Sequence, residues 1–184
     1  MMGELSLPAA LGALAAQGAA FLALLLAASA VHKASHWGQS LRVVRGFAGV
    51  PGPLAGASLS VAVACELAAA GLLVLPQARA SGAVLAALVW AAYLALLLRA
   101  ILQNRRNVDC GCSFGTAHRP LGAFHVTRNV LLVGTAAAVA AESAWGAAPA
   151  VAASQVLGAA ALLALYGALD QVMALQPLRA GVSA

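Results

Sequence analysis

Long apolar runs separated by short polar segments make up most of the chain. Residues 5–31, 80–98 and 143–169 contain no Lys, Arg, Asp or Glu, and residues 46–78 contain only Glu66. A transmembrane helix needs about 20 consecutive apolar residues, so each run is long enough to cross a bilayer. The pattern predicts an all-α, polytopic membrane helix bundle of about five transmembrane helices, a four-helix core plus one. The predicted helices cover residues 8–31, 54–75, 82–102, 124–141 and 149–175, within a single integral membrane domain spanning residues 1–184.

Two other interpretations of the apolar runs fit the sequence poorly. Strands of a membrane barrel alternate apolar and polar residues, whereas these runs are apolar throughout. A cleaved signal peptide begins with basic residues and has a short apolar core, whereas the first run follows Glu4 and is far longer. We therefore expect the first run to be a retained transmembrane helix.

The composition agrees with a membrane protein. Hydrophobic residues make up 63% of the chain and charged residues 8%, against about 25% charged residues in ordinary soluble domains. The net charge is +5, and all ten Lys and Arg residues lie outside the four apolar runs. A nucleic-acid partner is not expected, because it would require a basic patch on a soluble face. The expected partner of the apolar surface is the lipid bilayer.

Most basic residues fall on one side of the predicted bundle. The loops after the first and third helices, their flanks and the C-terminal tail carry Lys33, Arg42, Arg45, Arg99, Arg105, Arg106, Arg119, Arg128 and Arg179. The opposite side carries Arg79 as its one basic residue, with Glu4 and Glu142. Cytoplasmic loops carry the excess of Lys and Arg. The expected location is therefore the bacterial cytoplasmic (inner) membrane, with the N-terminus outside and the C-terminus in the cytoplasm.

The segment VDCGCSFG at residues 108–115 holds two of the three cysteines of the chain. Cysteines at i and i+2 can reach disulfide distance in a bent backbone, which Gly111 permits. Nearby arginines favour the reactive thiolate, and the small ring would be strained and therefore easily reduced. Cys110 and Cys112 are thus candidates for a redox-active disulfide that works by thiol–disulfide exchange.

Two other interpretations of this loop stay open. Cys110, Cys112, His118 and His125 supply four ligands suited to zinc, although short zinc motifs usually place two to four residues between the cysteines. Alternatively, the two cysteines simply occupy an irregular turn, as the glycines and Pro120 suggest. The predicted orientation places the loop in the cytoplasm, where thiols are usually kept reduced. This location argues against a purely structural disulfide.

The loop and its surroundings resemble the methylamine utilisation protein MauE family, which belongs to the wider DoxX-like group of redox-associated membrane proteins. The resemblance rests on DCGCSFG at residues 109–115, TRNVLL at 127–132, SAVHK at 29–33 and CELAAAGLLVLP at 65–76. One departure is Ser113, which is inserted before Phe114 relative to the C-G-C-F-G pattern of the family. The thiols themselves are unaffected by this insertion.

The resemblance implies a thiol–disulfide redox protein that assists the maturation of a disulfide-rich extracytoplasmic enzyme of the amine dehydrogenase type. Its expected partner is a thioredoxin-like redox protein, and a quinone is the candidate electron acceptor. In that scheme Cys110 and Cys112 are the catalytic pair of a membrane thiol–disulfide oxidoreductase. The alternative is a non-catalytic membrane scaffold or chaperone for a maturation complex, whose C-G-C loop is structural or holds zinc.

Two residues inside the second predicted helix are candidates for a supporting role. A charge at the bilayer centre costs about 2.5–3.5 kcal/mol on insertion scales, so Glu66 is either functional or paired with another helix. Cys65, next to Glu66, is either a relay thiol or a small buried hydrophobe. A small-solute transporter would also place a polar group at mid-membrane, and Glu66 is the one feature that suggests it.

The resemblance adds Lys33, Arg128 and Asn129 as supporting positions. For Arg128 the alternatives are stabilisation of a thiolate and simple anchoring at the membrane interface. Tyr93 is predicted to be a packing residue, and Asp170 is predicted to be a solvated carboxylate near the cytoplasmic end of the last helix.

Overall fold

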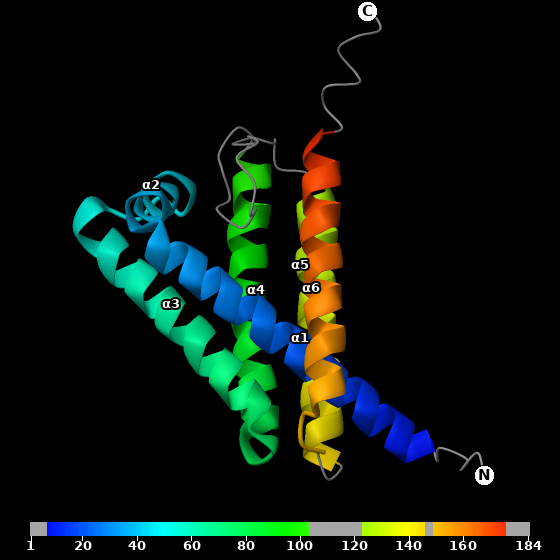
Figure 1. The fold of residues 1–184 in the computed structure, drawn as a ribbon. Helices are drawn as coiled ribbons and strands as arrows, with labels where there is room; N and C mark the ends of the chain where they lie inside the picture. The colour runs from blue at the N-terminus through cyan, green and yellow to red at the C-terminus, as the bar shows by residue number, and fades with distance from the viewer. Residues whose placement is uncertain (1–6, 104–122, 146–148, 176–184) are drawn as a thin grey trace, which may run out of the picture.

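The computed structural model describes residues 7–103, 123–145 and 149–175, and every regular element in those ranges is a helix (Figure 1). In chain order the elements are α1 (Leu7–Ser35), α2 (Trp37–Phe47), α3 (Gly52–Val74), the short 3₁₀ helix η1 (Pro76–Ala78), α4 (Arg79–Leu102), α5 (Ala123–Trp145) and α6 (Ala153–Leu175). The all-α fold class predicted from the sequence is confirmed.

Within the described ranges, five helical segments are long and apolar enough to cross a membrane: α1, α3, α4 with η1, α5 and α6. Successive long helices run in opposite directions, and α1 and α3 cross the bundle at a slant (Figure 1). Helices satisfy their backbone hydrogen bonds internally, as the lipid environment requires. The protein is therefore a multi-pass membrane protein, as the apolar runs predicted.

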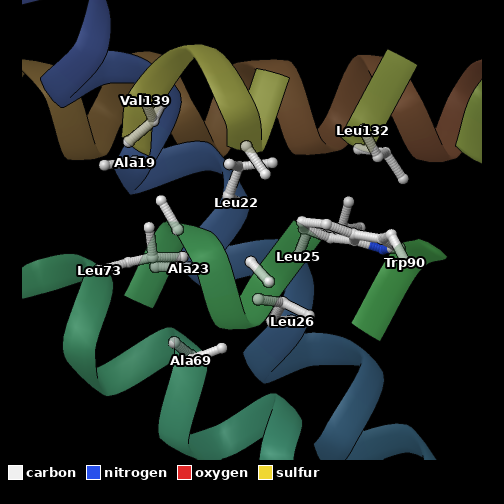
Figure 2. Packing of buried hydrophobic residues seen from close by; sticks show 14 residues of the cluster. Ala19, Leu22, Ala23, Leu25, Leu26, Ala69, Leu73, Trp90, Leu132 and Val139 are labelled. Carbon is white, nitrogen blue, oxygen red and sulfur yellow. The ribbon is translucent and has the colours of Figure 1, made fainter. Parts of the chain in front are cut away.

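Four of these helices build the core, and α6 packs on its outside. The central cluster of buried residues comes from α1, α3, α4 and α5, and includes Leu22, Leu73, Trp90 and Val139. From α6 only Leu163 and Tyr166 pack against this cluster, and both are partly exposed. Figure 2 shows alanines such as Ala19 and Ala69 among the larger side chains of this cluster, and small residues let helices approach closely.

The helix α2 was not predicted, and the end of α1 was placed too early. The segment expected to be a loop after residue 31 instead continues α1 to Ser35 and then forms α2. Lys33 is therefore a helical residue rather than a loop residue. The helix α2 is amphipathic: Leu41 and Val44 are partly buried, whereas Arg42 and Arg45 are exposed. A short helix of this kind suits the membrane interface, and α2 lies at the end of the bundle beside α1 and α3 (Figure 1).

The turn between α3 and α4 is tight because of one glycine. A Cβ atom added at Gly82 would lie 2.6 Å from the backbone nitrogen of Leu73 and 2.8 Å from the carbonyl carbon of Leu72. The helix α4 starts at Arg79, earlier than predicted, and Arg79 Nε donates a hydrogen bond of 3.2 Å to the carbonyl oxygen of Leu73. Arg79, expected at the membrane surface, is fully buried and holds the end of α3 against the start of α4.

Candidate functional site in the membrane core

A polar cluster inside the helix bundle surrounds the carboxylate of Glu66. Glu66 lies on α3 and is fully buried. Its Oε1 atom accepts hydrogen bonds from Lys33 Nζ at 2.6 Å, from Tyr93 Oη at 2.7 Å and from Ser29 Oγ at 3.1 Å. The cluster therefore ties three helices together, because Ser29 and Lys33 lie on α1 and Tyr93 on α4.

The residues of α1 in this cluster are positioned by helical periodicity. Ser29 and Lys33 are four residues apart and thus share one face of α1, where Lys33 Nζ donates a hydrogen bond of 2.5 Å to Ser29 Oγ. The Lys33 ammonium also lies 5.2 Å from the centre of the Tyr93 ring. A charge in the membrane is expensive unless it is paired, and the Lys33–Glu66 ion pair provides that pairing.

The two oxygens of the Glu66 carboxylate differ in their surroundings. Oε1 accepts three hydrogen bonds, whereas Oε2 is buried and has no hydrogen-bond partner among the described residues. An unsatisfied buried acceptor costs about 1–3 kcal/mol. Oε1 therefore receives all three hydrogen bonds, and Oε2 retains unused acceptor capacity.

A second polar cluster links α5 to α6. Arg128 Nη1 donates a hydrogen bond of 3.0 Å to Asp170 Oδ1, and both side chains are almost fully buried. The Arg128 guanidinium also lies 5.8 Å from the centre of the Tyr166 ring, within cation–π distance. The neighbouring Asn129 is buried and donates a hydrogen bond of 2.9 Å to the carbonyl oxygen of His125 one turn earlier in α5.

The structure thus brings Lys33 and Glu66 into direct contact, and places Arg128 and Asn129 side by side on α5. Cys65 is a partly buried free thiol on α3, next to Glu66 in sequence. The candidate redox cysteines Cys110 and Cys112 lie outside the described residues, so their role stays a prediction.

The zinc interpretation is also untested at three of its four positions. Cys110, Cys112 and His118 lie outside the described residues, and His125 is buried in the first turn of α5. In the part of the chain that the structure describes, no group of three His, Cys, Asp or Glu side chains is arranged to hold a metal ion.

Three residues of the two clusters were missed or misjudged from the sequence. Asp170 was expected to be solvated, but it is buried and paired with Arg128, because that face of α6 is turned toward α5. Tyr93 was expected only to pack, but its hydroxyl donates to Glu66. The sequence indicates Ser29 only through the segment SAVHK, which resembles the family. The four-residue spacing of Ser29 and Lys33 on an apolar helix was the one available signal.

Comparison with known proteins identifies one family. A sequence profile of the family described as Methylamine utilisation protein MauE matches residues 11–142. That range extends from α1 into the last turn of α5 and includes the Lys33–Glu66 pair, whereas Asp170 lies beyond it. No solved structure matches the chain.

Two curated proteins, each named Methylamine utilization protein MauE, are similar to the chain. The protein from Paracoccus denitrificans is 36% identical over 121 residues, and the one from Methylophilus methylotrophus is 37% identical over 126 residues. These alignments cover 65% and 66% of this chain and 64% of the length of each relative. Because the family profile matches well over half of the sequence, the chain belongs to the methylamine utilisation protein MauE family.

Proposed function

We propose that the protein acts in methylamine utilisation as a membrane thiol–disulfide redox protein. The observation that carries the proposal is the family match over residues 11–142, which includes Cys110 and Cys112 in the segment between α4 and α5. In this role the pair exchanges electrons with a thioredoxin-like protein. One thiolate attacks a disulfide, and the second resolves the mixed disulfide that forms. The client is a disulfide-rich extracytoplasmic enzyme of the amine dehydrogenase type.

The polar clusters support this proposal because they fix how α4 and α5 pack in the bundle. Tyr93 on α4 is held by Glu66, and Arg128 near the start of α5 is held by Asp170. The two helices that flank the Cys-Gly-Cys segment are therefore each tied to a buried carboxylate. Hydrogen bonds between buried polar groups are stronger in the low local dielectric, so these contacts favour one packing of α4 and α5, and a reactive thiol pair needs a reproducible geometry.

The distribution of charge supports the predicted orientation. At one side of the bundle, Lys33 and Arg99 lie near the ends of α1 and α4, and Arg128 lies near the start of α5 (Figure 1). The helix α2 at the same side carries Arg42 and Arg45. The positive-inside rule assigns that side to the cytoplasm of a bacterial inner membrane. Electrons then have to cross the membrane to the outer side, where the client enzyme lies. They cross either through a further thiol such as Cys65 or through a quinone.

Growth on methylamine tests the proposal. The gene is expressed in a Paracoccus denitrificans strain that lacks its own MauE protein. We expect the wild-type chain to restore growth, and we expect Cys110→Ser and Cys112→Ser each to abolish it without lowering the amount of protein in the membrane. The matched control in the same segment is Ser113→Ala, which leaves both thiols in place. Growth with either Cys→Ser variant, or loss of the variant protein from the membrane, would favour the scaffold function instead.

A further inference from the structure

A small cavity lies between the Glu66 cluster and the Arg128–Asp170 pair. Its polar wall is formed by Ser29, Tyr93, Arg128, Asn129 and Tyr166. Two of these groups, Ser29 and Tyr93, donate hydrogen bonds to Glu66, and Arg128 donates one to Asp170. The cavity wall therefore includes Arg128 of one ion pair and two hydrogen-bond donors to Glu66 of the other pair, but neither carboxylate.

The rest of the cavity wall is apolar and belongs to the core. It consists of Leu25, Leu26, Trp90 and Leu132, all of which are buried. Figure 2 shows these four residues on α1, α4 and α5, gathered at one end of the buried cluster. These four side chains belong to the same buried cluster that holds the bundle together.

The size of the cavity limits what it can hold. Its volume, measured for the centre of a water-sized sphere, is about 30 Å³. One buried water needs about 10–15 Å³ on this measure together with two to four polar partners. Roughly two waters therefore fit, whereas the ring of a quinone does not. Cavities lined only by apolar groups stay dry, but this wall offers hydroxyl, amide and guanidinium groups.

We propose that this cavity is an internal water site whose waters join the two buried ion pairs into one hydrogen-bonded network. A phenol oxygen can accept a hydrogen bond while its own O–H donates. A water can therefore donate to Tyr93 Oη while Tyr93 donates to Glu66. An Arg or Asn N–H group on α5 completes the bridge. A change at Arg128 on α5 then alters the hydrogen bonding of Glu66 on α3, although the two residues belong to different ion pairs. This inference is independent of the proposed redox function.

Hydroxyl-radical labelling in ¹⁸O water, on the intact protein in lipid nanodiscs, tests whether the cavity holds water. Radicals generated from an ordered internal water label the adjacent side chains even when these are buried. We expect label at Tyr93 well above that at Phe21, a core aromatic that does not line the cavity. The Leu132→Phe variant fills the cavity and should lose this label. Leu131→Phe makes the same change on the lipid-exposed side of α5 and should keep it.

A double-mutant cycle tests whether Tyr93 and Asn129 are coupled through the waters. It also tests the proposal if Leu132→Phe fails to fold. The shifts in unfolding midpoint of Tyr93→Phe and Asn129→Leu should not add in the double variant, because both remove partners of the same waters. In the control cycle, Tyr93→Phe is combined with Thr135→Val. Thr135 lies on α5 and outside this cavity wall, so the shifts should add. Label at Tyr93 no higher than at Phe21, or additive shifts in both cycles, would overturn the proposal.

Discussion

At the scale of single residues, the Lys33–Glu66 ion pair sets the energetics of the membrane core. Glu66 is fully buried and Lys33 is mostly buried, and Tyr93 and Ser29 add two further donors to the same carboxylate oxygen. Replacing a buried ion pair by apolar residues is often tolerated, whereas removing one partner leaves an uncompensated charge. Removing only one member of the pair should therefore cost more stability than replacing both members with apolar residues.

The difference between removing one partner and replacing both predicts the stability of Glu66 variants. Glu66→Gln keeps the shape of the side chain but leaves the Lys33 charge unpaired, so we expect the free energy of unfolding to fall by about 3–5 kcal/mol. The double variant Lys33→Met/Glu66→Leu should recover most of that loss. Denaturant titration in mixed micelles measures both effects. Glu142→Gln, at the other end of the bundle, is the matched control and should change stability by less than about 0.5 kcal/mol. Equal stability of Glu66→Gln and the wild type would contradict the ion pair.

At the scale of helices, Gly82 decides how closely α3 and α4 approach each other. An added Cβ would meet the backbone of Leu72 and Leu73 below 3.0 Å, and backbone atoms cannot move aside as the end of a side chain can. We expect Gly82→Ala to separate the two helices and to lower the thermal unfolding midpoint and the yield of folded protein. Gly71→Ala, at an α3 position with no neighbour within 4 Å, is the control and should behave like the wild type. Equal effects of both substitutions would mean that the close approach does not contribute to stability.

The helices themselves could be predicted better than their contacts. The length of an apolar run alone decides whether a helix can span the bilayer, so α1, α3, α4, α5 and α6 were predicted with errors of a few residues at their ends. The helix α2 was missed because eleven amphipathic residues are too short to span. The partners of Glu66 and Arg128 depend on the rotation of each helix about its axis. In lipid, an apolar sequence gives little information about that rotation because its inward and outward faces are both hydrophobic.

At the scale of the whole molecule, the uneven distribution of charge predicts the orientation. The end of the bundle that carries Lys33, Arg42 and Arg45 should face the cytoplasm. A fluorescent protein that folds only in the cytoplasm, fused after the last residue, should therefore fluoresce. An alkaline phosphatase fusion at the same point should be inactive. The opposite pair of results would reverse the orientation and place the segment between α4 and α5 directly on the client side.

The state of the two loop cysteines tests the proposed redox function most directly. Cells that carry the wild-type chain are treated with a membrane-impermeant maleimide before and after permeabilisation, each with and without prior reduction. The label on the peptide with Cys110 and Cys112 is read as a mass shift, separately from the peptide with Cys65. The redox function predicts that Cys110 and Cys112 are labelled only after permeabilisation, and that prior reduction increases the labelling. Full labelling of both thiols without reductant, unchanged by growth on methylamine, would show a permanently reduced pair and contradict the proposed exchange.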